Sequence, residues 1–192
     1  MVITSQLALF AQTPTIALPK GMRYAEAIVS KHEEKELAAF IATLPLKPFE
    51  FTGGFRGNRR VASFGSRYDY TAQRVAAAPD IPLMLLALRE KAAAFAGLAS
   101  EALQQALVTE YSPGAGIGWH RDRPHYGDII GVSLLAPCTF RLRLKTGNTW
   151  QRASLEAAPR SAYLLSGEAR SSWEHSIPPL EELRYSVTFR TL

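Results

Sequence analysis

Two segments in the first half of the chain carry apolar residues at helical spacing. The first, residues 30–44, opens with Ser30 and Glu33, three positions apart as in a capping box, and continues with apolar residues on one helical face. The second has Asp80 as its expected cap and stops at Gly97. The pattern therefore predicts two helices ahead of the strand-rich part of the chain.

From about residue 104 onward, short alternating segments separated by turn residues predict a series of strands. Their expected ranges are 106–111, 129–135, 139–145, 149–155, 161–165 and 183–191. The sequence has no internal repeat, low-complexity tract or long linker, so a single folding unit is the simplest interpretation. Two helices followed by a run of strands are typical of the α+β class.

Two of the expected strands alternate strictly between apolar and polar residues, so each has one face of each kind. In the third expected strand the polar face holds Arg141, Arg143 and Lys145, which suits either a solvated sheet face or a binding stripe. In the last strand Arg184 and Arg190 share the polar face, with Cα atoms roughly 20 Å apart. If that face lines a pocket, these two arginines are more than surface charges.

The composition is that of an ordinary globular protein, with 47% hydrophobic and 20% charged residues among 192. This length suits one domain, and without a run of ~20 apolar residues we expect no membrane span. The first twenty residues lack a basic leader and a cleavage site, so we interpret them as mature sequence. Cys138 is the only cysteine, which excludes an internal disulfide and favours the cytoplasm.

One pair of residues suggests metal chemistry. His120 and Asp122 lie two positions apart, so in an extended segment both side chains point the same way and can bind one ion. A His-x-Asp tripeptide alone is a weak signal, but His175 lies downstream as a possible third ligand. Two histidines and one carboxylate leave open positions for a co-substrate and O2 at a ferrous ion, whereas zinc usually takes a tetrahedral set.

An ordered series of motifs surrounds these residues and resembles the AlkB family of 2-oxoglutarate oxygenases. The series is Tyr-Ser-Pro-Gly at 111–114, His-Arg-Asp at 120–122, Gly-Val-Ser-Leu-Leu at 131–135, Trp-Glu-His at 173–175 and Arg-Tyr-Ser-Val-Thr-Phe-Arg at 184–190. The resemblance implies a double-stranded β-helix, or jelly-roll barrel, with two buttressing N-terminal helices. It implies a single catalytic domain over 1–192, with a substrate-recognition lid at about 48–80 and the jelly-roll core at 104–192.

The resemblance also implies a cofactor site. Residues matching His120, Asp122 and His175 hold Fe(II) in that family. The arginine matching Arg184 pairs with the distal carboxylate of 2-oxoglutarate, and the one matching Arg190 lies near the end that chelates the iron. This agrees with the chemistry of the residues, because a planar guanidinium pairs with a carboxylate in a way that lysine cannot copy.

Three further residues complete the expected 2-oxoglutarate site. Tyr111 matches a tyrosine that hydrogen-bonds the co-substrate. Thr109 and Ser186 stand where the family commonly has asparagine, and each can still donate one hydrogen bond. The co-substrates implied by the resemblance are therefore 2-oxoglutarate and O2.

Substrate contacts are expected in residues 51–70, where aromatic residues and arginines are interleaved. Such a surface suits stacked bases and phosphates, although a hairpin with packed aromatics and solvated arginines explains the pattern as well. The candidates are Phe51, Phe55, Arg60, Tyr68 and Tyr70. A net charge of +5 favours a polyanionic partner such as nucleic acid, although charge alone does not establish one.

The leading hypothesis is an iron-dependent oxidoreductase that dealkylates bases in DNA or RNA, as in alkylation damage repair, and acts as a monomer. Pro124 leaves the lesion open, because repair members of the family often have an acidic residue at that position. The same chemistry on a protein or small molecule is the nearest alternative. A catalytically silent jelly roll that binds nucleic acid is a distant one.

Overall fold

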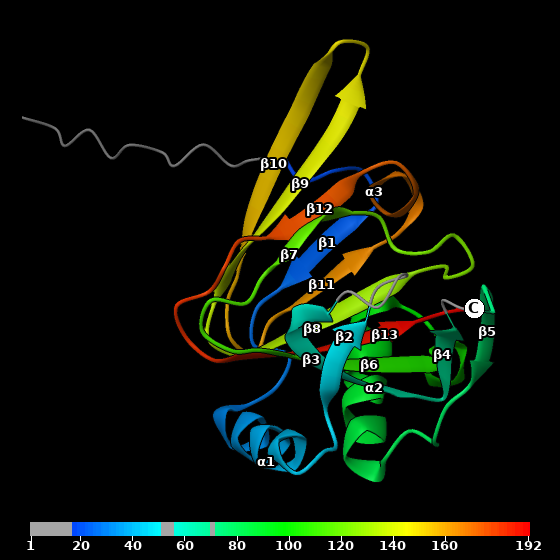
Figure 1. Cartoon of the computed structure of the whole chain (residues 1–192), viewed down its shortest axis with the longest axis vertical. Coiled ribbons are helices and arrows are strands. Elements are labelled where there is room, and N and C mark those ends of the chain that lie inside the picture. The colour runs from blue at the N-terminus through cyan, green and yellow to red at the C-terminus, as the bar shows by residue number, and fades with distance from the viewer. Residues whose placement is uncertain (1–16, 51–55, 70–71) are drawn as a thin grey trace, which may run out of the picture.

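Two antiparallel sheets form the centre of the molecule, which is seen here in a computed structural model describing residues 17–50, 56–69 and 72–192 (Figure 1). The major sheet contains, in spatial order, β1 (Met22–Ala25), β11 (Ala162–Leu165), β8 (Ile129–Leu135), β13 (Arg184–Arg190), β6 (Gln105–Tyr111), β3 (Arg56–Phe64) and β2 (Lys47–Glu50). The minor sheet contains β10 (Thr149–Ala157), β9 (Cys138–Thr146), β12 (Glu174–Ile177) and β7 (Ile117–His120). A separate hairpin is formed by β4 (Ser66–Asp69) and β5 (Arg74–Ala77). The arrangement is the predicted α+β jelly roll.

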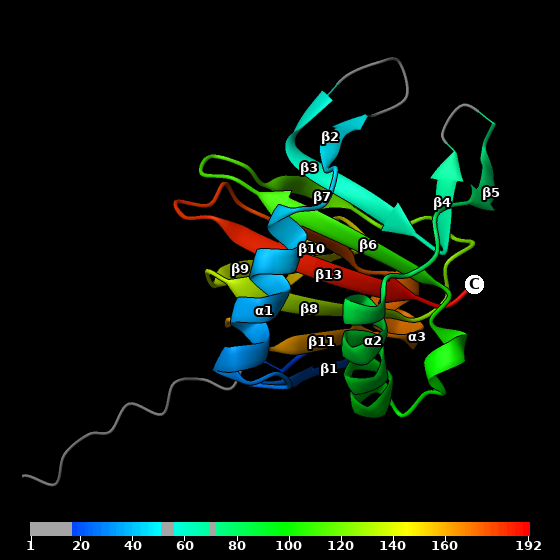
Figure 2. The same cartoon turned by 90° about the horizontal axis from the view of Figure 1, so that it is seen from below.

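Two helices cover the outer face of the major sheet, as predicted (Figure 2). In α1 (Lys31–Ala42) the expected capping box is present: the Ser30 hydroxyl accepts from the Glu33 backbone N–H, and the Glu33 carboxylate accepts from that of Ser30. In α2 (Leu83–Ala96) the predicted stop at Gly97 is confirmed, with φ of 71°.

The predicted cap of the second helix is wrong. Pro82, not Asp80, occupies the N-cap position of α2, with extended backbone angles of φ −59° and ψ 149°. The physical reason is that a proline disfavours helical backbone in the residue before it. Ile81, which precedes Pro82, is therefore not the first residue of the helix, as a cap at Asp80 would require. Asp80 is then too far away to cap it.

The major sheet separates two apolar cores, and the alternation of β13 decides what each side receives. Tyr185, Val187 and Phe189 join the core beneath the helices. Arg184 and Arg190 belong to the opposite face, toward the minor sheet, and both are buried. The predicted polar face of the last strand therefore lines the interior between the two sheets.

Six predicted strands are confirmed to within two residues at each end. The sequence did not predict six strands of four residues each, β1, β2, β4, β5, β7 and β12, nor the longer β3. It also did not predict the short helix α3 (Gly167–Ser171) and the 3-10 turn at Ser100–Ala102. None of the helices within the described ranges has the length and apolar character needed to cross a membrane.

The packing of α2 on the sheet can be tested with two leucines of the same helix. Leu85 is fully buried in the helix-side core, whereas Leu83 is 84% exposed. We expect Leu85→Ala to lower the free energy of unfolding by about 2–5 kcal/mol, because it leaves a cavity. Leu83→Ala should change it by less than about 0.5 kcal/mol. Urea unfolding followed by circular dichroism measures both, and equal losses would show that α2 does not pack as described.

Candidate metal centre

Strand pairing brings the three predicted metal-binding side chains together. β12 pairs with β7 so that His175 lies opposite His120, and Asp122 follows two residues after His120. The Asp122 Oδ1 atom is 3.4 Å from His120 Nε2 and 3.8 Å from His175 Nε2. One potential ligand atom from each residue lies within 4.8 Å of the others. A single ion can therefore contact all three side chains.

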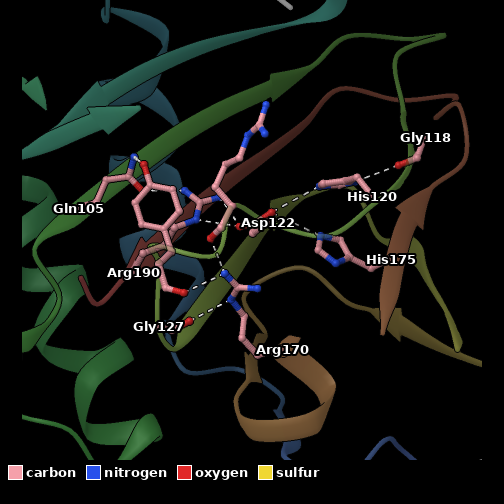
Figure 3. Close-up of polar contacts among 10 residues, drawn as sticks. Gln105, Gly118, His120, Asp122, Gly127, Arg170, His175 and Arg190 are labelled. Atoms are coloured by element: carbon pink, nitrogen blue, oxygen red, sulfur yellow. Dashed lines mark hydrogen bonds and ion pairs between the residues drawn. The ribbon is translucent and has the colours of Figure 1, made fainter. Parts of the chain in front are cut away.

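The protonation of His175 and the orientation of His120 also suit a cation. Burial and the neighbouring His120 lower the pKa of His175 to about 3, so its imidazole is neutral near pH 7. The His120 Nδ1 atom lies 2.9 Å from the carbonyl oxygen of Gly118, and Nε2 is on the side of Asp122 (Figure 3). A neutral imidazole oriented through its other nitrogen is the usual form of a histidine ligand.

Arg190 holds the carboxylate of this set. Its Nε and Nη2 atoms each lie 2.8 Å from Asp122 Oδ2, and its Nη1 donates to Gln105 Oε1 over 2.8 Å (Figure 3). Gln105 in turn donates to the hydroxyl of Tyr126 over 3.0 Å. Burial raises the pKa of Asp122, but Arg190 and the two histidines outweigh it and hold that pKa well below its usual range. The carboxylate stays ionised, and its Oδ1 remains directed at the histidines.

Sequence reasoning did not find Gln105 and Tyr126. Gln105 lies opposite Arg190 in the β6–β13 ladder, so it shares the interior face. The only sequence signal for it was a polar residue immediately ahead of the predicted strand 106–111.

Arg170, on α3, anchors the turn that follows Asp122. Its Nε donates to the carbonyl oxygen of Gly127 at 3.0 Å, and its Nη2 donates to those of Arg123 and Tyr126 at 2.6 and 2.8 Å. Three backbone acceptors on one guanidinium tie this turn to α3, which is connected directly to β12. The two segments that supply the candidate metal-binding side chains are therefore linked by Arg170 as well as by the sheet.

Arg184 provides a site for a carboxylate. Its side chain is fully buried, and its Nε donates to Ser133 Oγ over 3.0 Å. Its Nη1 and Nη2 atoms have no hydrogen-bond partner among the described residues, while Tyr111 places its ring 5.1 Å from the guanidinium carbon. An unsatisfied buried guanidinium is costly, and a bidentate carboxylate is the group that satisfies both nitrogens. The chain's own residues therefore fit a buried organic acid.

The two predicted hydrogen-bonding residues lie beside Arg184. Thr109 and Ser186 are opposite each other in the β6–β13 ladder, and both are buried on the interior face. Ser133 is the partner of Ser186 on the other side, in β8. Three hydroxyl-bearing residues thus form a row across the sheet next to the buried arginine.

A second tyrosine in this interior was missed. Tyr163 lies opposite Gly131 in the β11–β8 ladder, and its phenol ring covers that glycine so closely that a Cβ there would overlap the ring. Burial raises the pKa of Tyr163, so the hydroxyl stays protonated near neutral pH. The only sequence signal was Gly131 within an apolar strand, which often marks close approach of another group.

The predicted substrate residues have different surroundings. Tyr68 stacks on His125 with ring centroids 4.6 Å apart, and Arg123 lies 5.2 Å from the centre of the Tyr68 ring. This places Tyr68 beside the turn that follows Asp122. Phe51, Phe55 and Tyr70 lie outside the described residues.

Arg60 is on the other face of the major sheet. It forms a bidentate ion pair with Glu110, at 2.7 and 2.6 Å, on the face shared with the helix-side core. The neighbouring Arg59 points the opposite way, is buried and lies 4.2 Å from the centre of the Phe49 ring. A substrate contact from Arg60 stays a prediction, and this placement does not favour it.

A pocket of about 540 Å³ opens beside Asp122. Its lining includes three arginines, at positions 121, 123 and 170, together with Tyr126 and Glu174. Cations at the rim of a concave site attract anionic ligands. The pocket therefore suits a negatively charged substrate near the metal-binding side chains.

A His-Asp-His set beside a buried carboxylate site, enclosed by a jelly roll, defines a class of metal-dependent enzymes that consume an organic acid. Residues 24–190 match the model of the 2OG-Fe(II) oxygenase superfamily, and the chain belongs to this family as an AlkB-like member. The resemblance drawn from the sequence is confirmed. Its cofactors are those of the family: Fe(II), 2-oxoglutarate and O2.

Individual relatives agree with this assignment. The chain is 31% identical over 144 residues to the "Alkylated DNA repair protein ALKBH8 homolog" of Arabidopsis thaliana. The match covers 62% of this chain and 42% of the relative. It is 32% identical over 124 residues to "Alpha-ketoglutarate-dependent dioxygenase AlkB" of Salmonella typhimurium. That match covers 58% of this chain and 56% of the relative. The chain thus spans about half the length of these relatives. The solved structure of OsALKBH1 shares the fold, with a TM-score of 0.65 at 16% identity over 92% of this chain and 99% of that one.

The contact between Gly131 and Tyr163 can be tested by a double-mutant cycle. We expect Gly131→Ala to lower the free energy of unfolding by about 1–3 kcal/mol, because the added methyl overlaps the phenol ring. In a Tyr163→Ala background the same substitution should cost much less, since the ring is gone. Urea unfolding of the four proteins measures the coupling. An equal cost in both backgrounds would mean that Tyr163 does not cover Gly131.

Proposed function

We propose that this chain is an Fe(II)- and 2-oxoglutarate-dependent dioxygenase that removes alkyl groups from bases in nucleic acid. The observation that carries the proposal is the convergence of His120, Asp122 and His175, with Arg190 on the carboxylate. On the same face of β13, the Nη1 and Nη2 atoms of the buried Arg184 have no hydrogen-bond partner among the described residues. In this proposal the three residues hold the iron. Arg184 takes the distal carboxylate of the co-substrate.

The remaining site residues have supporting roles in the proposal. Tyr111, Thr109 and Ser186 hydrogen-bond the co-substrate from the interior face of the major sheet. Arg190 keeps Asp122 ionised and in place, and through this carboxylate it acts near the metal. The apolar core around Phe140 and Leu142 excludes bulk water from the back of the site.

When bound, Fe(II), 2-oxoglutarate and O2 would supply the oxidation: one oxygen atom of O2 would enter succinate as the keto acid loses CO2, and the other would enter a substrate C–H bond. On an N-methyl group the hydroxylated product loses formaldehyde. The protein's part is to hold the substrate methyl beside the metal-binding side chains, and a wrong position is costly in rate.

Three observations favour nucleic acid as the substrate. The relatives in Arabidopsis thaliana and Salmonella typhimurium carry names that refer to alkylated DNA repair and to AlkB. The stacked Tyr68 and His125 present aromatic surface next to the Asp122 turn, which suits a flipped base. Arg121 and Arg123 line the adjacent pocket, which suits phosphate.

The expected lid at about 48–80 then consists of β2–β3, an extension of the major sheet, and the β4–β5 hairpin, both on one side of the barrel (Figure 2). Action as a cytoplasmic monomer stays part of the proposal. The same site on a protein or small-molecule substrate is the alternative that the following experiment separates.

Turnover tests the proposal directly. The purified protein, given Fe(II), 2-oxoglutarate and a single-stranded oligonucleotide with an N-methylated base, should release formaldehyde in step with succinate. His120→Ala should lower the rate by about 100-fold or more, since it removes a proposed ligand. His32→Ala should leave the rate unchanged, because His32 is an exposed residue of α1. If oligonucleotides never raise succinate formation above its level without substrate, the nucleic-acid assignment fails.

The role of Arg184 has a separate test. Lysine keeps the positive charge but cannot form the planar bidentate pair, so Arg184→Lys should raise the KM for 2-oxoglutarate by about 10-fold or more. The matched control is Arg160→Lys, because Arg160 is partly exposed and pairs only loosely with Glu34 at 3.6 Å. Calorimetric titration of 2-oxoglutarate with Mn(II) in place of iron should show the same loss of affinity. Unchanged binding in Arg184→Lys would exclude Arg184 from the site.

A further inference from the structure

The outer face of the minor sheet carries a set of cationic and aromatic side chains, which we call the outer patch. Its members come from three strands and are Trp119, Arg141, Arg143, Lys145, Trp150 and Arg152. Arg152 lies opposite Arg143, and Trp150 opposite Lys145, in the β9–β10 ladder, so these four share one face. The sequence left open whether Arg141, Arg143 and Lys145 form a solvated face or a binding stripe, and the two tryptophans beside them favour a binding stripe.

The aromatic residues of the patch are held in fixed positions. The guanidinium carbon of Arg143 lies 4.4 Å from the centre of the Trp119 ring and 4.3 Å from that of Trp150. Arg143 Nε also donates to Glu174 over 2.6 Å, and Arg141 donates to Ser176 over 3.0 Å. Cation–π contacts with Arg143 thus order two indoles on the outer face of the minor sheet, one from each edge strand, while Trp150 keeps 39% of its surface exposed.

The charge of this face is positive. Four cations share it with two carboxylates, Glu174 and Glu156, and the Glu174 carboxylate is paired with Arg143. Lys145 and Arg152 are both exposed, toward the end of the β9–β10 hairpin that extends beyond the rest of the minor sheet (Figure 1). An array of cations with an exposed indole matches phosphates and unpaired bases.

The outer patch adjoins the metal centre. Trp119 alternates with His120 on β7, and Glu174 alternates with His175 on β12, so the patch lies on the reverse face of the strands that carry the histidines. Glu174 also lines the pocket beside Asp122, together with Arg121. A polynucleotide that leaves this pocket around the β7 edge of the minor sheet would next meet Trp119, against which Arg141 and Arg143 pack.

We propose that the outer patch binds the single-stranded segment flanking the base held at the metal centre, with phosphates at Lys145 and Arg152 and a base stacked on Trp150. The proposal rests on the proposed function, which supplies the nucleic acid. A single strand is the partner that fits, because its bases are available for stacking, whereas a duplex hides them. The patch then favours long substrates over short ones without touching the reacting group.

Binding of an unmethylated, fluorescently labelled 20-nucleotide single strand tests the proposal by anisotropy with the full chain. The double variant Lys145→Gln/Arg152→Gln should weaken binding by about 10-fold and reduce the magnitude of the slope of log affinity against log salt by about 1.4, because two phosphate contacts are lost on a single strand. The control Lys31→Gln/Lys35→Gln removes the same charge from two exposed positions of α1 and should change affinity by less than about two-fold.

Trp150→Ala separates stacking from charge. It should weaken single-strand binding by about 5-fold or more, with the salt slope unchanged, because base stacking does not release counterions. Binding to a duplex of the same length should not change. If the patch variants match the α1 control, or if Trp150→Ala affects duplex and single strand equally, the patch is not a single-strand site.

A short substrate distinguishes this proposal from the proposed function. Formaldehyde release from a methylated trinucleotide should be the same in the wild type and the patch variants, because it cannot reach the hairpin. If the trinucleotide is demethylated but 20-nucleotide binding is insensitive to the patch, only the patch proposal is overturned. If no methylated nucleotide is turned over, the proposed function fails, and the anisotropy measurements still decide the patch.

Discussion

The ion pair between Arg190 and Asp122 is the interaction on which the candidate site depends. It joins β13 of the major sheet to the turn after β7 of the minor sheet, and all the atoms involved are buried or nearly so. A buried charge pair stabilises a fold only when its geometry and remaining hydrogen bonds are good. Here Gln105 occupies the third guanidinium nitrogen, and one carboxylate oxygen is left for the histidines. The pair therefore fixes both the spacing of the sheets and the orientation of Asp122.

The alternation of β13 extends this constraint along the interior. Its apolar residues fill the core under the helices, and its polar residues place one arginine near Asp122 and the other, Arg184, at the far end of the same face. Arg184 has two buried nitrogens with no hydrogen-bond partner among the described residues, which costs free energy of folding. An anion bound to these nitrogens would remove that cost. Such a ligand binds the folded state alone and so stabilises the fold.

Much of this could be predicted from the sequence. Strands with strong alternation or long apolar runs were placed correctly. The spacing of His120 and Asp122, with His175 downstream as a possible third ligand, named side chains that the sheet brings together. The two strands that carry the histidines were not predicted, because β7 and β12 are four residues long and mix glycine and polar residues with apolar ones. Short strands of this kind form because their neighbours pair with them, which a local pattern does not record.

The remaining contacts of the site could be assigned only once it was known which residues of each strand face the interior and how the strands are paired. Arg60 and Arg59 are adjacent in sequence but lie on opposite faces of β3, and only the pairing with Glu110 shows which one turns away from the metal centre. Tyr163 reaches the interior over Gly131 because the β11–β8 register aligns the two. The outer patch needs three strands in register before its tryptophans meet Arg143. Contacts between distant segments are set by tertiary structure, so no window of sequence contains them.

The most direct test of the metal centre is a crystal structure of the protein with Fe(II) and 2-oxoglutarate, from crystals grown without oxygen. We expect iron bound by the Nε2 atoms of His120 and His175 and by Oδ1 of Asp122, with the distal carboxylate of 2-oxoglutarate on Nη1 and Nη2 of Arg184. Iron at any other position, or a carboxylate bound away from Arg184, would contradict the site described here.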